Sequence, residues 1–120
     1  MAREFKSGDV LIFQLESGYG LLKVLAIDEL ENGESIWHLA AYADLFLDAE
    51  MADAALANPE NMSYTEPHLA LTNRAFEATQ TSRMTNLPLT DAEIASVRNW
   101  HENPNRRVSD ASIRLLLGLR

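Results

Sequence analysis

Hydrophobic residues in the first third of the chain gather in short runs that turn residues separate. The runs 10–15, 19–27 and 35–42 are rich in β-branched and aromatic residues, which is typical of strands. Between them, Glu16-Ser17-Gly18 predicts a tight turn, and Asn32-Gly33 predicts a type I′ hairpin turn with positive φ angles. The pattern therefore predicts a three-stranded antiparallel meander.

Both faces of this meander carry apolar side chains. Val10 and Ile12 share one face of the first strand, while Leu11 and Phe13 share the other. A lone open sheet would leave one of these apolar faces in water. We therefore expect a strongly bent antiparallel sheet, an SH3-like, partly closed barrel, that packs against C-terminal helices.

The middle of the chain gives weaker signals. Asp48 is a candidate N-cap for a short helix over 48–57, which Asn58-Pro59 ends. The polar stretch 59–67 predicts a surface loop. Residues 68–78 favour a fourth strand, broken at Asn73, and the hydroxyl-rich stretch 79–86 favours another loop.

The clearest local signal begins at Thr90. Thr90-Asp91-Ala92-Glu93 is a capping box, which predicts a helix that ends at Asn103-Pro104. A last helix over 109–119 is apolar almost all round, so either the sheet or a partner must bury it. The second alternative is a homo-oligomer that associates through this apolar C-terminal helix.

These elements predict an α+β fold. The chain of 120 residues has the size of one domain, and we expect a single domain over 1–120, sheet-rich in 5–78 and helical in 89–119. No run of residues is long and apolar enough for a membrane helix, and the chain contains no cysteine. We therefore expect a cytoplasmic protein without a membrane contact.

The charge is distributed unevenly along the chain. The net charge is −8, which disfavours nucleic acid as a partner. No Lys or Arg lies between Lys23 and Arg74, although ten acidic residues do. One interpretation is ordinary solvation of the surface. The other is that the acidic 28–53 segment binds a basic protein partner, and its candidate residues are Asp28, Glu29, Glu31, Glu34, Asp44, Asp48, Glu50 and Asp53.

No catalytic motif accompanies this charge pattern. The chain has no G-x-S-x-G elbow, and its three histidines lie in different predicted elements without a helical i, i+4 pair. We therefore expect no metal site, no cofactor and no enzymatic activity. The alternative is a pocket between sheet and helices that binds a small molecule or phosphate, or that serves a minor enzyme. Its candidate residues are His38, His68, Arg74 and His101.

A short basic cluster follows the predicted helix that begins at Thr90. Asn105-Arg106-Arg107 is of a type that is usually solvated, but two arginines can also hold a carboxylate or phosphate through paired hydrogen bonds.

Residues 5–46 also carry a family resemblance. The segment 5–12 contains Gly-Asp-Val, the segment 18–25 opens with Gly-Tyr-Gly, and the segment 37–46 ends a strand in aromatic and acidic residues. This pattern resembles the HocA-type family of predicted toxin-immunity proteins. The resemblance implies an SH3-like start and a non-enzymatic partner that blocks a toxin domain, and the acidic segment suits a basic toxin. It implies no catalytic residue.

Overall fold

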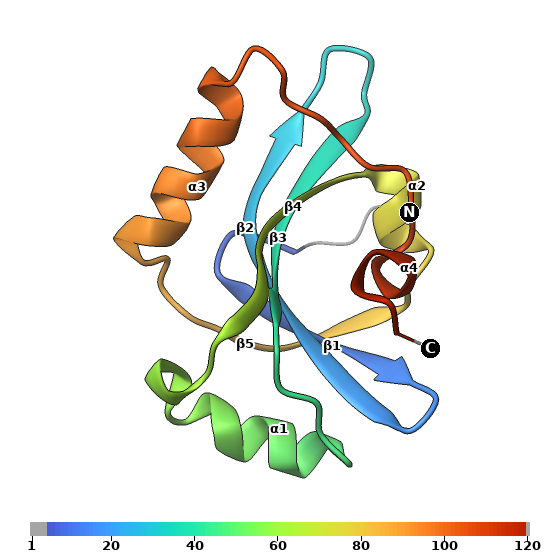
Figure 1. The fold of residues 1–120 in the computed structure, drawn as a ribbon, viewed down its shortest axis with the longest axis vertical. Coiled ribbons are helices and arrows are strands. Elements are labelled where there is room, and N and C mark those ends of the chain that lie inside the picture. Colours follow the sequence, from blue (N-terminus) through green and yellow to red (C-terminus); the bar gives the residue numbers. More distant parts are fainter. Residues whose placement is uncertain (1–4, 120) are drawn as a thin grey trace.

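Five antiparallel strands form one sheet in the order β4-β3-β2-β1-β5. The structure is a computed structural model that describes residues 5–119. Its fold is α+β, as predicted, and helices lie on both sides of the sheet (Figure 1). The strands are β1 (Asp9–Leu15), β2 (Gly18–Glu29), β3 (Ser35–Tyr42), β4 (Tyr64–Thr72) and β5 (Thr81–Asn86).

The meander β1-β2-β3 has the predicted strands, but one of its turns differs. β1 and β2 pair as far as Leu15 and Gly18, which leaves a two-residue turn. At the next hairpin the predicted type I′ turn is wrong, because Asn32 does not have a positive φ. The Gly33 amide donates instead to the Leu30 carbonyl at 3.0 Å, and Gly33 itself has φ +85. This is the arrangement of a three-residue hairpin loop that ends in a glycine bulge.

Two stretches that the sequence predicts as loops contain strands in the structure. β4 begins at Tyr64, inside the stretch predicted as a loop, and ends at Thr72, whose hydroxyl caps α2 (Asn73–Glu77). The stretch 79–86 is not a loop, since its residues from Thr81 onward pair with β1. β5 was missed because this edge strand has few apolar residues, although threonine itself favours strands.

Two of the helices begin at the capping residues that the sequence predicts. Asp48 caps α1 (Ala49–Leu56), which the 3-10 turn η1 (Pro59–Asn61) follows, and the capping box begins α3 (Asp91–Glu102). The last helix is shorter than predicted: α4 spans only Ile113–Leu117. Its burial is also one-sided, since Ile113 is fully buried while Leu115 is 73% exposed. None of the described helices has the length and apolar character needed to cross a membrane.

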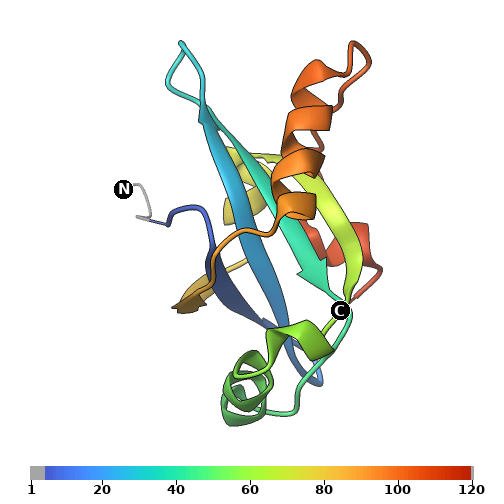
Figure 2. The ribbon, with the colours of Figure 1, turned by 90° about the vertical axis from the view of Figure 1, so that its left-hand side faces the viewer.

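Helices cover both apolar faces of the sheet, as the strand pattern predicts. On one face, α2 and α4 pack over a core in which the rings of Trp37 and Phe76 stack at 3.9 Å. On the other face, α1 covers one end of the sheet and α3 covers the other (Figure 1; Figure 2). This second face, beneath α3, holds the polar groups described below.

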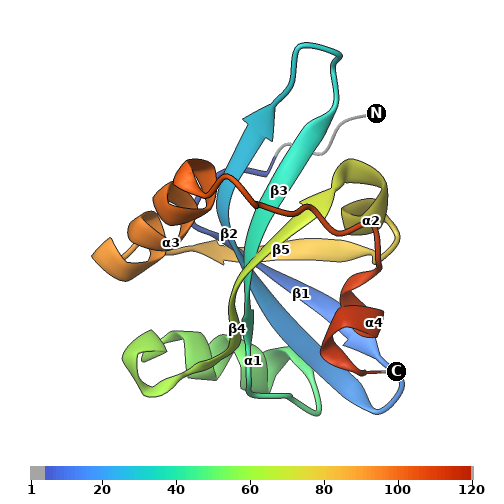
Figure 3. The ribbon, with the colours of Figure 1, turned by 45° about the horizontal axis from the view of Figure 1, so that its top comes forward.

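The sheet is strongly bent but open. In Figure 3, β5 crosses the direction of β3, and within the described residues β4 and β5 are the two outermost strands of the sheet. The prediction of a partly closed, SH3-like barrel is therefore not confirmed.

Candidate functional site

A bulge in β2 places Asp28 and His38 on the same face of the sheet. The register of β2 against β3 shifts between Val24 and Ala26, and Ala26 then pairs with His38. Because side chains alternate along a strand, Asp28 lies on the same face as Ala26. The two side chains meet there, with His38 Nε2 at 2.8 Å from Asp28 Oδ2.

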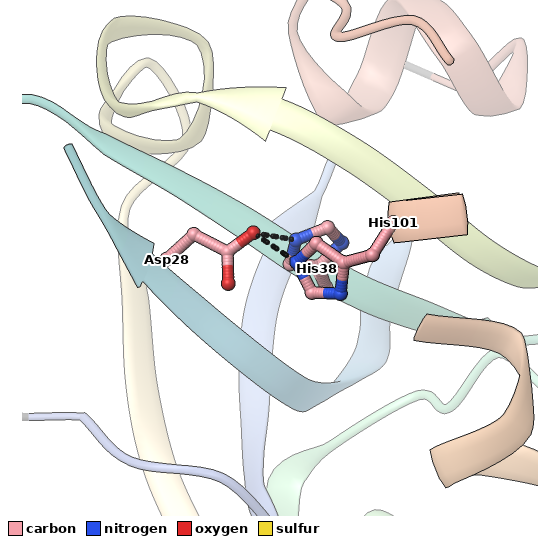
Figure 4. Close-up of side chains that lie close together, drawn as sticks. All are labelled: Asp28, His38 and His101. Carbon is pink, nitrogen blue, oxygen red and sulfur yellow. Dashed lines mark hydrogen bonds and ion pairs between the residues drawn. The ribbon is translucent and has the colours of Figure 1, made fainter. Parts of the chain in front are cut away.

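The last turn of α3 brings a second histidine to the same carboxylate oxygen. His101 Nε2 lies 2.6 Å from Asp28 Oδ2, so the two imidazoles converge on one atom (Figure 4). Trp100, the neighbour of His101, meets the His38 ring edge to face at 4.7 Å between ring centroids.

β4 contributes the third histidine. Ala70 pairs with His38, and His68 lies two residues earlier on the same face. His68 Nε2 is 2.9 Å from His38 Nδ1, so both ring nitrogens of His38 have partners. The His38 side chain is fully buried, and these two contacts satisfy its hydrogen-bonding groups. We call Asp28, His38, His68 and His101 the histidine cluster.

Burial and mutual contact shift the ionisation of this cluster. Burial alone would raise the pKa of Asp28, but the hydrogen bonds and charges of His38 and His101 outweigh it and the pKa lies below its ordinary value. Burial lowers the pKa of His38, although the Asp28 carboxylate opposes this shift. Burial and the neighbouring histidines lower the pKa of His68 to about 4. At neutral pH the carboxylate is therefore ionised, whereas His38 and His68 are neutral.

Neutral imidazoles fix the direction of the hydrogen bonds. The network assigns the His38 proton to Nε2, because the Asp28 carboxylate can only accept. His38 Nδ1 then accepts from the Nε2–H of His68. A metal ion on His38 Nε2 would reverse this assignment, with Nδ1–H donating to His68.

The cluster has the ligand types of a transition-metal site. One ring nitrogen each of His38 and His101 and a carboxylate oxygen of Asp28 all lie within 4.8 Å of one another. A tetrahedral ion with bonds of about 2.0–2.1 Å separates its ligands by about 3.3 Å, a value that lies between the shortest observed contact of 2.6 Å and the upper limit of 4.8 Å. Two histidines and one carboxylate occur in zinc and non-haem iron sites. His68 occupies the position of an outer partner that orients a ligating histidine.

The structure brings together three of the four residues of the predicted alternative pocket. His38, His68 and His101 meet, but Arg74 lies on α2 and pairs with Asp110. Within the described residues, no interaction joins Arg74 to a histidine. The spacing of the three histidines along the chain does not reveal this meeting, because strand register and helix packing bring them together.

The predicted acidic face is divided by the fold. Asp28 belongs to the histidine cluster. Glu29, Glu31 and Glu34 lie exposed around the tip of the β2-β3 hairpin, at the top of Figure 1. The remaining four candidates lie at α1 or just before it, at the opposite end of the molecule (Figure 1): Asp44, Asp48, Glu50 and Asp53. The acidic segment therefore forms two separate surfaces.

A second polar cluster, which the sequence did not reveal, lies under the first turn of α3. Lys23 Nζ is 2.9 Å from Glu93 Oε1 and 2.9 Å from the Pro88 carbonyl, and both side chains are buried. The Tyr64 hydroxyl donates to the other oxygen of Glu93. These groups line a cavity of about 400 Å³ together with Tyr42. The sequence signal that could have indicated this cluster is Lys23, a charged residue inside the apolar run 19–27.

Comparison with known proteins gives no relative from which a function can be transferred. No protein-family model matches the chain, and no curated protein or solved structure matches it. The resemblance of residues 5–46 to the HocA-type family stays a prediction. The function has to be argued from the site itself.

Proposed function

We propose that the protein binds a divalent transition-metal ion through Asp28, His38 and His101. The observation that carries the proposal is the convergence of two imidazole nitrogens on one carboxylate oxygen, at 2.8 and 2.6 Å. Three separate elements supply these groups: β2, β3 and α3. Coordination favours a deprotonated carboxylate and a neutral imidazole, which are the forms that Asp28 and His38 hold at neutral pH.

Three protein ligands leave a coordination position for water or a small molecule. The cluster is not sealed, since the side chains of Asp28 and His101 are 26% and 45% exposed. An ion and a small ligand can therefore reach the cluster from solvent. The proposed role is metal-dependent binding of a small molecule between the sheet and α3. This proposal refines the alternative pocket predicted from the sequence.

Titration of the metal-free protein with Zn²⁺, and separately with Co²⁺, tests this function. We expect one ion per chain, with a Co²⁺ visible spectrum that reports nitrogen and oxygen ligands. Asp28→Asn weakens binding by more than about 100-fold, because even the outer partners of metal ligands contribute about 10- to 100-fold. Glu29→Gln is the matched control, since it removes an exposed carboxylate from the adjacent residue. Equal affinities in the two variants would refute the proposal.

His101→Gln provides a second variant in case Asp28→Asn does not fold. The His101 side chain is nearly half exposed on α3, so its replacement leaves the core intact. Arg98→Gln, also exposed on α3, is its control. Loss of Zn²⁺ binding in His101→Gln with an unchanged circular dichroism spectrum supports the proposal, whereas unchanged binding contradicts it.

We also propose that the β2-β3 hairpin binds a basic protein partner in the cytoplasm. The exposure of Glu29, Glu31 and Glu34 at a projecting hairpin tip favours this second function. Complementary charge accelerates association and excludes wrong partners. The resemblance to SH3-like immunity proteins agrees with a partner that is a basic toxin.

A pull-down from the native host at low and moderate salt tests the hairpin proposal. We expect a stoichiometric basic protein that is lost as salt rises, because salt screens exposed charges. Glu29→Gln, Glu31→Gln and Glu34→Gln combined abolish retention. Neutralising Asp44, Asp48 and Asp53 at the other end of the molecule leaves retention of the basic protein unchanged. Retention by the hairpin variant would contradict the proposal.

A further inference from the structure

A groove lies beside the histidine cluster, between β4 and the segment 103–109 that follows α3. Its volume is about 510 Å³, and it is open to solvent. His68 joins the groove to the cluster, because it lines the groove and contacts His38. We call it the arginine groove, and its polar and aromatic lining includes His68, Trp100, Asn103, Asn105, Arg106 and Arg107.

The charge of this groove is opposite to that of the chain. Two arginines line it and none of its described lining residues is acidic, whereas the whole chain has a net charge of −8. The guanidinium of Arg107 makes no ion pair or hydrogen bond within residues 5–119. Arg106 donates only to the backbone carbonyls of His101 and Asn103, at 3.5 and 3.4 Å. Neither cation is neutralised by a carboxylate.

Local contacts hold the backbone of Arg107 and the side chain of Arg106 in place. The Trp100 indole N–H donates to the Arg107 carbonyl at 3.0 Å. The Arg106 guanidinium lies 5.6 Å from the centroid of the Trp100 ring, which is cation–π geometry. The Asn103 side chain accepts from the Asn105 amide at 2.8 Å, which closes the turn after α3. A ligand therefore meets an Arg106 guanidinium that is already oriented, whereas the Arg107 guanidinium stands on a fixed backbone and is free to turn toward it.

We infer that the arginine groove binds a small oxyanion, a phosphate or carboxylate group carried by a small molecule. Guanidinium groups hold such anions through paired, charge-assisted hydrogen bonds, and Asn103 and Asn105 supply further polar groups beside them. Trp100 offers a surface for a ring or chain attached to the anion. This inference goes beyond the proposed metal site and does not depend on it.

Nuclear magnetic resonance of the two indole N–H groups tests the inference. Trp100 reports on the groove, while Trp37, whose indole N–H donates to Asn73, reports on the core of the opposite face. Protein stripped of metal ions by passage over a chelating resin is titrated with inorganic phosphate and, separately, with acetate, at ionic strength held constant with chloride. We expect a saturable shift of the Trp100 signal and none of the Trp37 signal. The anion that saturates at lower concentration identifies the preferred group.

Arg107→Gln is the decisive variant, because its exposed side chain has no described partner and its loss leaves the fold intact. It raises the dissociation constant at least about tenfold, as expected when charge-assisted hydrogen bonds are removed. Arg98→Gln removes the same charge from the exposed side of α3 and leaves the constant unchanged. Equal shifts in both variants, no saturation, or an identical response to chloride alone would overturn the inference. Each outcome is independent of metal binding.

Discussion

Glu93 Oε1 lies 2.9 Å from Lys23 Nζ, and this buried ion pair joins residues 70 positions apart in the chain. The same oxygen accepts the Thr90 amide at 2.9 Å, while the other accepts the Tyr64 hydroxyl. One carboxylate therefore closes the first turn of α3 and also fastens that helix to β2 and β4.

Loss of the Glu93 charge destabilises the protein more than loss of the helix cap. Glu93→Gln leaves the Lys23 ammonium buried without a counter-charge, and breaking a buried pair costs about 3 kcal/mol. Thr90→Ala removes only the cap and costs about 1 kcal/mol. Urea denaturation of the two variants and the wild type measures both values. Equal losses would show that the ion pair adds nothing beyond the cap.

The Glu93 contribution to stability disappears in acid. Burial alone would raise the pKa of Glu93, but the hydrogen bonds from Tyr64, the Thr90 amide and Lys23 outweigh it and hold the pKa below its ordinary 4.5. A lowered pKa in the folded state means that the contribution is complete above pH 4.5 and is lost as pH falls through the folded value. The difference in the free energy of unfolding between wild type and Glu93→Gln should therefore stay constant above pH 4.5 and shrink as pH falls below it, which urea denaturation at a series of pH values measures. A difference that stays constant below pH 4.5 would contradict this assignment.

His68 tunes the proposed metal site without being a ligand. Its Nε2 contacts His38 Nδ1, the nitrogen that is left free when Nε2 binds an ion. His68→Leu should weaken Zn²⁺ binding by about 10- to 100-fold, the usual contribution of an outer partner. His68→Gln, which keeps a hydrogen-bonding group, should recover part of the loss. A positioning role predicts that affinity falls in His68→Leu and partly recovers in His68→Gln, while the number of ions bound per chain stays the same. Isothermal calorimetry measures both quantities.

Position 33 favours glycine because of its backbone conformation, and not because a larger side chain would clash there. Gly33 has φ +85, and a side chain built there meets no atom within 4 Å. Gly33→Ala should therefore cost about 1 kcal/mol through backbone strain alone. Gly33→Asn should cost less, because asparagine tolerates this conformation better. Thermal unfolding of both variants tests the order, and an equal loss in the two would point to a cause other than φ.

The histidine cluster and the Lys23 ion pair both depend on one irregularity in β2. Lys23 and Asp28 are five residues apart, so a regular strand would place them on opposite faces of the sheet. The register shift between Val24 and Ala26 inserts one residue, and both side chains then contact α3. Nothing in the composition of this run marks the bulge, so the sequence could not predict that both residues face the same helix.

What the sequence determined by itself is local. Turn residues and strand runs predicted the meander, Asp48 predicted the start of α1, and the capping box predicted α3, because each signal lies within a few residues of the element that it begins. Edge strand β5 was missed, since its threonines resemble a loop when its partner β1 is not known.

Only the tertiary structure decided which distant groups meet. Strand register placed His38 between Asp28 and His68, and the packing of α3 added His101. The course of β3 from the hairpin tip to α1 divided the acidic segment between the two ends of the molecule. The physical reason is that a strand pattern fixes the face of a side chain but not its neighbour. The neighbour depends on bulges and on contacts between elements far apart in the chain.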